Sequence, residues 1–419
     1  MKRFGFFFVL LLCCLNVFGA EDKDDGKDRY GYHLIQNRKI ARIPFELHSN
    51  LIVVPVKINN SDTLHFILDT GVSSTIITDP AAIRSQKLQF TRKVKLTGAG
   101  EGGQLLASVA INNVLTMGHM RANHQNMVVL DEDVLQLSEY VGIPIHGIFG
   151  YEVFNNFIVT IDFQRREILL QQPSSYRYRR SRGVRYPIMI QDTKPYTDVL
   201  AVVDNGKTVP IRVVIDTGAG HALLINRNNG NEDVRLPDKV IRAQLGRGLS
   251  GVINGNLGRI HKIRFGNFEM DNVVASFPDS LAFGVKIGTQ TERNGNIGCE
   301  ILRRFKVTFN YHDKYLVLKP VKRILKQTFE HDMSGMELKA RGLNLRNYYI
   351  EKIIDDSPAD QAGLKEGDEV IFINGSSAAK MHISEIYKLL QKGDGKELEI
   401  LVRRNGNIIF TQMVLKRLI

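Results

Sequence analysis

Two Asp-Thr-Gly triplets are the features of this 419-residue chain whose residue types and spacing could do chemistry. The first lies in FILDTGVSST and contains Asp69, and the second lies in RVVIDTGAGHALL and contains Asp216, 147 residues further on. A lone carboxylate after an apolar strand is usually a turn residue or a helix cap. Two carboxylates brought face to face cannot both ionise easily, so they share one proton. Such a pair can activate a water molecule and protonate a leaving amine, which is what peptide hydrolysis without a covalent intermediate requires.

Other segments repeat at nearly the same distance along the chain. VKLTGAGEGG, residues 94–103, matches AQLGRGLSGV, residues 243–252. IFGYEVFNNFIVTIDFQRREILL, residues 148–170, matches NIGCEILRRFKVTFNYHDKYLVL, residues 296–318. Several matched elements at one period indicate two homologous lobes.

Each lobe has the pattern of a β structure. Short runs rich in Val, Ile, Phe and Thr are bounded by Gly, Asn and Asp, which predicts strands joined by turns. The apolar run before each Asp suggests a strand that is buried on both faces. Gly150 and Gly298 follow further apolar segments, and a glycine there lets one strand pass close behind the Asp loop. We therefore expect a mainly β chain.

Over roughly residues 40 to 320 the repeat resembles the retropepsin-like and pepsin-like aspartic proteases. The resemblance implies two closed β-barrel lobes in one chain, with Asp69 and Asp216 as the catalytic pair and no metal or other cofactor. It implies that Thr70 and Thr217 reach across to the opposite lobe, and that the glycines after them offer amides to the carboxylates. The implied supporting residues are Thr70, Gly71, Ser73, Thr217 and Gly218, with Gly150 and Gly298 behind them, and the flap glycines are Gly98, Gly100, Gly102, Gly246 and Gly248.

The two loops depart from the family pattern after the triplets. Ser73 is placed to hydrogen-bond the outer oxygen of Asp69, whereas Gly220 has no side chain to do the same for Asp216. Fewer hydrogen bonds to a carboxylate raise its pKa. We therefore expect an activity optimum at mildly acidic or neutral pH. His221, just past the second triplet, is expected to hydrogen-bond locally, and a catalytic role is the alternative.

From about residue 325 the pattern changes. The run SPADQAGLKEGDEVIFING, residues 357–375, is similar to bacterial PDZ domains. In that family a Gly-apolar-x-apolar loop captures a peptide C-terminus on its backbone amides, and the peptide adds as a strand. The resemblance implies a loop at Gly335, Met336, Glu337 and Leu338, with residues 342–345 (GLNL) as the alternative. A PDZ domain that only packs against the protease as a structural lid is the other interpretation.

The N-terminus has the pattern of an export signal. Basic residues precede an apolar stretch of about a dozen residues, which is short for a membrane-spanning helix of about 20. We expect cleavage near residue 19 or 20, with an uncleaved anchor as the alternative. Together with the bacterial PDZ pattern, this predicts the periplasm or the cell surface. The mature chain would retain Cys299 alone and therefore no internal disulfide.

The charge distribution and the histidine pattern bear on whether the chain binds nucleic acid or a metal ion. The net charge is +12, yet basic residues are spread along the chain, and the densest cluster is SYRYRRSRGVRYP at 175–187. Interleaved Tyr and Arg can bind nucleic acid, but no nucleic-acid fold motif accompanies them, so we predict a solvated linker or an exposed hairpin. His119 and His124 in HMRANH form only a weak metal pattern, and we expect ordinary loop histidines there.

These observations predict six segments. They are a signal peptide at 1–20, an N-terminal extension at 21–40, lobe 1 at 41–173, a basic linker at 174–186, lobe 2 at 187–322 and a PDZ domain at 323–419. The function they favour is an exported aspartic endopeptidase that takes an extended peptide or protein substrate. The alternatives are a catalytically inert peptide-binding scaffold and a zymogen cut in residues 21–40 or in the linker.

Overall fold

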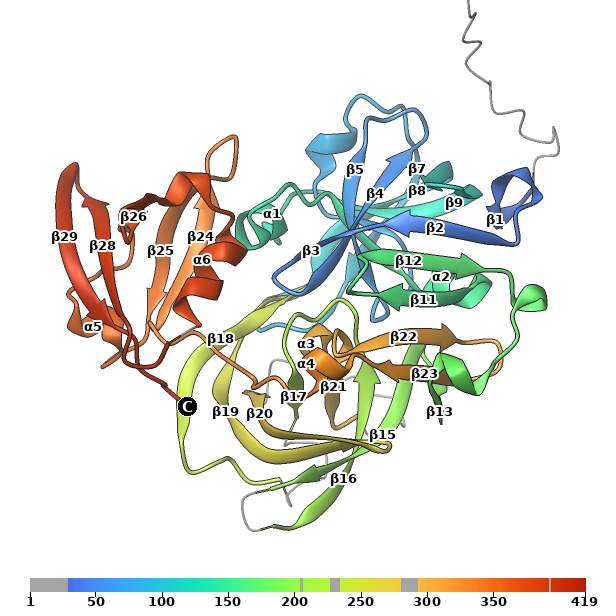
Figure 1. Cartoon of the computed structure of the whole chain (residues 1–419). Coiled ribbons are helices and arrows are strands. Elements are labelled where there is room, and N and C mark those ends of the chain that lie inside the picture. Colours follow the sequence, from blue (N-terminus) through green and yellow to red (C-terminus); the bar gives the residue numbers. More distant parts are fainter. Residues whose placement is uncertain (1–28, 204–205, 227–233, 280–292, 392) are drawn as a thin grey trace, which may run out of the picture.

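The chain forms two β-rich lobes and a smaller C-terminal domain (Figure 1). The computed structural model describes residues 29–203, 206–226, 234–279, 293–391 and 393–419. The predicted signal peptide lies outside these residues. The prediction of a mainly β chain is confirmed.

Lobe 1 is built on six strands whose pairings run in a closed ring. The order around it is β9, β6, β10, β5, β4 and β8, and β8 pairs again with β9. The elements are β1 (Gly31–Leu34), β2 (Ile40–Pro44), β3 (Glu46–His48), β4 (Leu51–Ile58), β5 (Leu64–Asp69), β6 (Ile76–Ile77), β7 (Gln89–Leu96), β8 (Leu105–Met117), β9 (Met120–Leu130), α1 (Leu137–Val141), β10 (Gly147–Gly150), α2 (Tyr151–Asn156), β11 (Ile158–Asp162) and β12 (Glu167–Gln171).

Lobe 2 repeats this arrangement. Its ring runs through β15, β16, β21, β17, β20 and β19, and it closes where β19 pairs with β15. The elements are β13 (Val184–Pro187), β14 (Met189–Gln191), β15 (Lys194–Val202), β16 (Thr208–Ile215), β17 (Leu223–Ile225), β18 (Val240–Gly248), β19 (Gly251–Phe265), β20 (Phe268–Pro278), β21 (Gly295–Ile297), α3 (Cys299–Leu302), β22 (Phe305–Asn310), β23 (Tyr315–Pro320) and α4 (Lys322–Leu325).

A third sheet joins the lobes. Its order is β13-β23-β22-β11-β12-β2, so that each lobe supplies one half and β11 meets β22 in the middle. Thr160 is directly opposite Thr308 in this pairing, and their hydroxyls lie 2.8 Å apart. One hydrophobic core runs continuously through both lobes, because the buried faces of all these strands are almost wholly apolar.

The third domain, at the C-terminal end of the chain, has its own core and one sheet in the order β24-β25-β26-β28-β29. Ser357 caps its first helix by accepting the amide of Asp360, and Asn405 and Gly406 both have positive φ in the last hairpin turn. The elements are β24 (Met336–Arg341), β25 (Asn347–Ile353), α5 (Pro358–Gln361), β26 (Glu369–Ile373), β27 (Ser376–Ser377), α6 (Ile383–Leu390), β28 (Glu397–Arg404) and β29 (Asn407–Val414).

Two segments expected outside the lobes are integrated into them. Residues 31–34 of the expected N-terminal extension form β1, which pairs with β9, and the Tyr32 hydroxyl donates to Glu152 Oε2 at 3.0 Å. The basic linker ends in β13, which pairs with β23. Arg182 lies over the ring of Tyr176 and Arg185 over that of Tyr315, so the aromatic and basic side chains of this segment pack on each other and on lobe 2.

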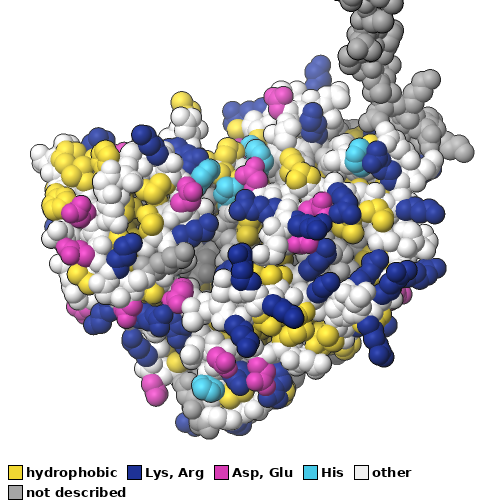
Figure 2. Space-filling model, viewed as in Figure 1, with side chains coloured by type: hydrophobic (Ala, Val, Ile, Leu, Met, Phe, Trp, Pro, Cys, Tyr) yellow, Lys and Arg dark blue, Asp and Glu magenta, His cyan; other side chains and the backbone are white. Residues whose placement is uncertain are grey.

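Basic side chains are spread over the viewed surface, as their spacing along the sequence indicated. Figure 2 shows Lys and Arg side chains spread over the viewed face, with Asp and Glu among them. Within the described residues, no helix has both the length and the apolar character to cross a membrane.

Candidate active site

Each Asp-Thr-Gly loop follows a strand that pairs in parallel with a second strand of the same lobe. Asp69 ends β5, which runs parallel to β10 with Asp69 beside Gly150. Asp216 follows β16, which runs parallel to β21, and its amide donates to the carbonyl of Ile297 at 2.9 Å. A Cβ at Gly150 would overlap the carbonyl oxygen of Asp69, and one at Gly298 would overlap that of His221. Glycine therefore permits the close passage behind each loop.

The threonines of the two triplets lock the loops together. The backbone amide of Thr70 donates to Thr217 Oγ1 and that of Thr217 to Thr70 Oγ1, both at 3.0 Å. The Thr70 hydroxyl then donates to the carbonyl of Ile215 at 2.6 Å, and the Thr217 hydroxyl to that of Leu68 at 2.8 Å. Both side chains have no exposed surface. Every polar atom of this buried network is satisfied, which fixes the two loops relative to each other.

The two carboxylates lie in one shared site. The Gly71 amide donates to Asp69 Oδ1 at 2.5 Å, and the Gly218 amide donates to Asp216 Oδ1 at 3.0 Å. A Cβ at Gly218 would overlap the carboxylate of Asp69, so each loop faces the acid of the other lobe. Burial, followed by the negative charge of Asp216, raises the pKa of Asp69 to about 8. The pair therefore holds a proton at neutral pH.

Sequence reasoning missed one side chain at this site. Asn296 Nδ2 donates to Asp216 Oδ2 at 2.7 Å, and Asn296 Oδ1 lies 3.0 Å from His221 Nε2. Gly220 was expected to leave the outer oxygen of Asp216 without a hydrogen-bond donor, but Asn296 of β21 provides that donor. Ser73, which was expected to bond Asp69, is exposed, and no hydrogen bond joins it to Asp69 among the described residues. A signal was available, because the repeat aligns Asn296 with the apolar Ile148.

The two predicted flaps meet tip to tip. The amide of Ser250 donates to the carbonyl of Ala99 at 2.8 Å, and the amide of Gly98 donates to Ser250 Oγ at 3.0 Å. Both carboxylate oxygens of Glu101 accept hydrogen bonds from Asn254. The flap glycines allow this crossing, since a Cβ at Gly100 or Gly248 would overlap backbone of the opposite flap.

Asp69 and Asp216 are partly exposed in this conformation. A cavity of about 560 Å³ lies at their tips, lined by Thr97, Gly98, Gly100, Glu101, Gly102, Ser250 and Asp279, and none of these residues belongs to an Asp-Thr-Gly loop. In flap 2, the hairpin of β18 and β19, Gly246 of β18 has a φ of +153° and nothing close to its Cβ position. Opening the tips would uncover the space above the pair, as in other enzymes closed by loops.

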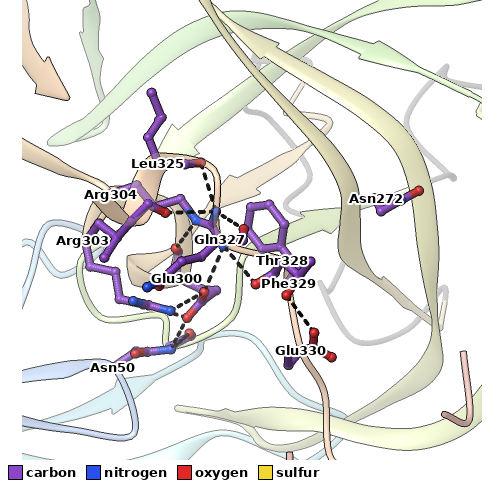
Figure 3. A network of polar contacts seen from close by, with 12 residues as sticks. Asn50, Asn272, Glu300, Arg303, Arg304, Leu325, Gln327, Thr328, Phe329 and Glu330 are labelled. Carbon is purple, nitrogen blue, oxygen red and sulfur yellow. Dashed lines mark hydrogen bonds and ion pairs between the residues drawn. The ribbon is translucent and has the colours of Figure 1, made fainter. Parts of the chain in front are cut away.

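A buried arginine holds the segment that follows α4 against lobe 2 (Figure 3). Arg304 is 1% exposed and donates to the carbonyls of Leu325 at 3.2 Å and Gln327 at 2.5 Å, with its guanidinium 3.5 Å from the centre of the Phe329 ring. It also pairs with Glu300, whose carboxylate accepts from Asn50 of lobe 1 at 2.9 Å. Asn50 in turn donates to the carbonyl of Gly220, four residues after Asp216.

The four residues expected to form the PDZ carboxylate loop have partners within the chain. The amide of Gly335 donates to Asp332 at 2.7 Å, and that of Met336 donates to Ser334 Oγ at 3.2 Å. Glu337 accepts the amide of Gln244 on β18 at 3.2 Å. Leu338 bonds through its amide to the Tyr387 hydroxyl of α6 at 2.8 Å. In this conformation the backbone amides of Gly335, Met336 and Leu338 are already bonded within the chain.

Helix α1 of lobe 1 covers the same edge of the third domain. It packs against β24, where the buried Lys339 lies 2.9 Å from Glu139 and 2.9 Å from the side-chain oxygen of Gln136. Tyr140 of this helix accepts from Arg247 of flap 2 at 2.7 Å. The helix therefore contacts both the third domain and a flap.

Among the described residues, no three His, Cys, Asp or Glu side chains are grouped so that they could hold a metal ion. In the weak pattern, His119 lies in the turn before β9 and His124 lies in β9, with its ring stacked on that of Tyr30 at 5.3 Å.

Comparison with known families agrees with this geometry. The family model described as aspartyl protease matches residues 54–153 and again residues 199–301, and the PDZ domain model matches residues 349–404. The prediction of two retropepsin-like lobes followed by a PDZ domain is confirmed.

Individual relatives cover much less of the chain. Serine protease HTRA1 of Xenopus tropicalis is 38% identical over 66 residues, which is 16% of this chain and 14% of that protein. Tight junction protein ZO-3 of Canis lupus familiaris is 29% identical over 93 residues, which is 22% of this chain and 10% of that protein. Among solved structures, the photosystem II D1 C-terminal processing protease covers 23% of this chain and 26% of its own, at 18% identity and a TM-score of 0.21.

Proposed function

We propose that this chain, two retropepsin-like aspartyl protease repeats followed by a PDZ domain, is an exported aspartic endopeptidase. The observation that carries the proposal is the pair Asp69 and Asp216, which share one site between the two lobes, with the two flaps joined at their tips. The predicted signal and the bacterial PDZ pattern favour the periplasm or the cell surface as the place of action.

The chemistry follows from the single proton held by the pair. One carboxylate takes a proton from a water molecule while the other donates its proton to the carbonyl oxygen of the peptide bond. The hydroxide oxygen bonds to the carbonyl carbon and forms a tetrahedral diol. The amide nitrogen then takes a proton from the first carboxylate, the C–N bond breaks, and the second carboxylate recovers its proton from a diol hydroxyl. An acid and an amine leave, and the enzyme returns to its starting state.

The protease and PDZ domains indicate that the partner is a peptide or protein. An extended substrate fits a site that is covered by two β-hairpins, because the flap strands offer backbone groups on both sides. We propose that the PDZ domain accepts a peptide C-terminus only when the intramolecular contacts of β24 are released.

Hydrolysis of a proteome-derived peptide library from pH 3 to pH 8 tests the proposal. We expect the wild-type protein to cleave, and Asp69→Asn and Asp216→Asn each to lose turnover by several orders of magnitude while retaining the same melting temperature within a few degrees. Cleavage that survives both substitutions would refute an aspartic mechanism. A wild-type protein that binds peptides and cleaves none across the whole pH range would favour the inert scaffold.

A further inference from the structure

The two halves of the catalytic pair are not equivalent in their surroundings. Asp216 accepts two hydrogen bonds, one on each oxygen, from the Gly218 amide and from Asn296 Nδ2. Among the described residues, and apart from the contact of the two carboxylates with each other, Asp69 accepts one, from the Gly71 amide. A donor aimed at a carboxylate stabilises its charged form, so the extra bond favours ionisation of Asp216 over that of Asp69.

The position of Asn296 explains why only one lobe has this donor. Asn296 lies on β21 between Val214 of β16 and Leu224 of β17, and it is 5% exposed. The matching position in lobe 1 is Ile148, which lies between Ile67 and Ile76. An amide on a buried central strand is costly unless it is paired, and here both ends are paired.

His221 sets the orientation of that amide. The NH₂ group of Asn296 faces Asp216, and its oxygen faces His221 Nε2. An amide oxygen can only accept a hydrogen bond. The imidazole therefore donates from Nε2. Burial lowers the pKa of His221, which keeps the ring neutral at neutral pH, and a neutral ring with its proton on Nε2 makes this bond.

The other ionisable groups around the pair do not reverse this assignment. Burial raises the pKa of Cys299 and of Tyr311, and both stay neutral. The positive charge of Lys194 on β15 acts on Asp69 and that of Arg293 acts on His221, but each is a smaller influence than burial. Burial is the largest cause of the raised pKa of Asp69, and the negative charge of Asp216 raises that pKa further.

We propose that Asn296, oriented by His221, is a positioning residue that holds Asp216 as the ionised member of the pair and leaves the shared proton on Asp69. The proposal rests on the proposed function and deepens it by assigning roles. Asp216 then takes the proton from water, and Asp69 donates its proton to the carbonyl oxygen. In the second step Asp216 returns its proton to the leaving nitrogen, and Asp69 recovers one from the diol.

The test replaces Asn296 with the residue that lobe 1 uses, Asn296→Ile. The first measurement is a ¹³C NMR titration of the aspartate carboxyl groups, which needs no turnover. We expect the lower titration step of the pair to rise by about one pH unit, because Asp216 loses a donor to its charged form. An unchanged titration in a folded variant would overturn the proposal, whether or not the protein cleaves peptides.

The second measurement is the pH dependence of kcat/KM. In Asn296→Ile the acidic limb should move up by about one pH unit, whereas a purely structural role would lower the rate at every pH without moving the limb. His221→Gln keeps a donor towards Asn296 and should leave the limb near its wild-type place, while His221→Ala should move it part of the way. A limb that moves equally in both His221 variants would refute the orienting role of the ring. Failure of the protease proposal is distinct, because it appears as absent wild-type cleavage with the NMR titration intact.

Discussion

Thr70 and Thr217 exchange hydrogen bonds across the boundary between the lobes, each hydroxyl accepting the other residue's backbone amide at 3.0 Å. Each hydroxyl also donates to a carbonyl that precedes the opposite Asp. The four bonds form one closed network in a region with no exposed side-chain surface. The distance between the two carboxylates therefore depends on residues that do not themselves react.

We expect Thr217→Val to leave two buried partners of its hydroxyl unpaired, the Leu68 carbonyl and the Thr70 amide. The free energy of unfolding should fall by about 2–4 kcal/mol, since each unsatisfied buried group costs about 1–3 kcal/mol. Urea denaturation measures this change. The peptide cleavage rate should fall more than stability predicts, because the loops lose their fixed spacing. Thr160→Val, at the hydroxyl contact with Thr308, is the control, with a stability loss but little effect on the rate.

Asp69 should make the protein less stable as the pH rises. Its folded-state pKa is raised to about 8, above the ordinary value of 3.8, so the folded state binds more protons than the unfolded state between these two values. Stability then falls as the pH climbs through that window, by roughly 2 kcal/mol or more. Thermal melts of wild type and Asp69→Asn at pH 5 and pH 8 measure the difference. The melting temperature of the variant should depend less on pH, and an equal dependence in both proteins would contradict the prediction.

The flap tips should be sensitive to added methyl groups at particular positions. A Cβ at Gly100 would overlap the backbone of Ser250 and Gly251, and the φ of Gly100 is +125°. Gly100→Ala should therefore weaken flap closure and lower kcat/KM about tenfold or more. Gly103→Ala is the matched control, because nothing lies within 4 Å of its Cβ position and its φ is not positive. Equal activity of the two variants would argue against the tip contact.

Arg304 should be the costliest charged residue to replace in lobe 2. Arg304→Met would remove the donor to several backbone carbonyls and leave Glu300 with one less cationic partner. Breaking a buried ion pair by removing one partner costs about 3–5 kcal/mol, so we expect a loss of that size by chemical denaturation. Arg303→Met removes a more exposed partner of the same Glu300 and should cost less than half as much. A similar loss in both would indicate that the backbone contacts contribute little.

The contact between α1 and β24 should hold the third domain on the protease. Lys339 is 6% exposed and pairs with Glu139, so Glu139→Gln leaves a buried cation with a weaker partner. We expect faster backbone hydrogen exchange in β24 and in the β18 strand of flap 2, by about tenfold, since Tyr140 of the same helix binds Arg247. Lys388→Met on the exposed face of α6 is the control and should change neither strand. Faster exchange in β24 alone would show that the flap is not coupled.

The repeat made much of the site predictable. The elements that recur at one spacing are the two Asp-Thr-Gly triplets, the glycine-rich hairpins and a later glycine. Their glycines lie where two backbone segments pass close together, which few other residues allow. The contacts of Asn296 with Asp216 and of Glu337 with Gln244 were not predictable, because they join segments that are far apart in the sequence. Only the difference between Ile148 and Asn296 in the aligned repeats signalled one of them.

The pairing of β11 with β22 has the same pattern when read from either side. Val159 lies opposite Phe309 and Ile161 opposite Val307, with Thr160 and Thr308 at the centre. This is the isologous contact by which two identical subunits form a symmetric dimer. In such a dimer every substitution would occur twice. Joined in a single polypeptide, the halves are free to differ, and an amide can be added beside one acid while the other keeps its apolar neighbour.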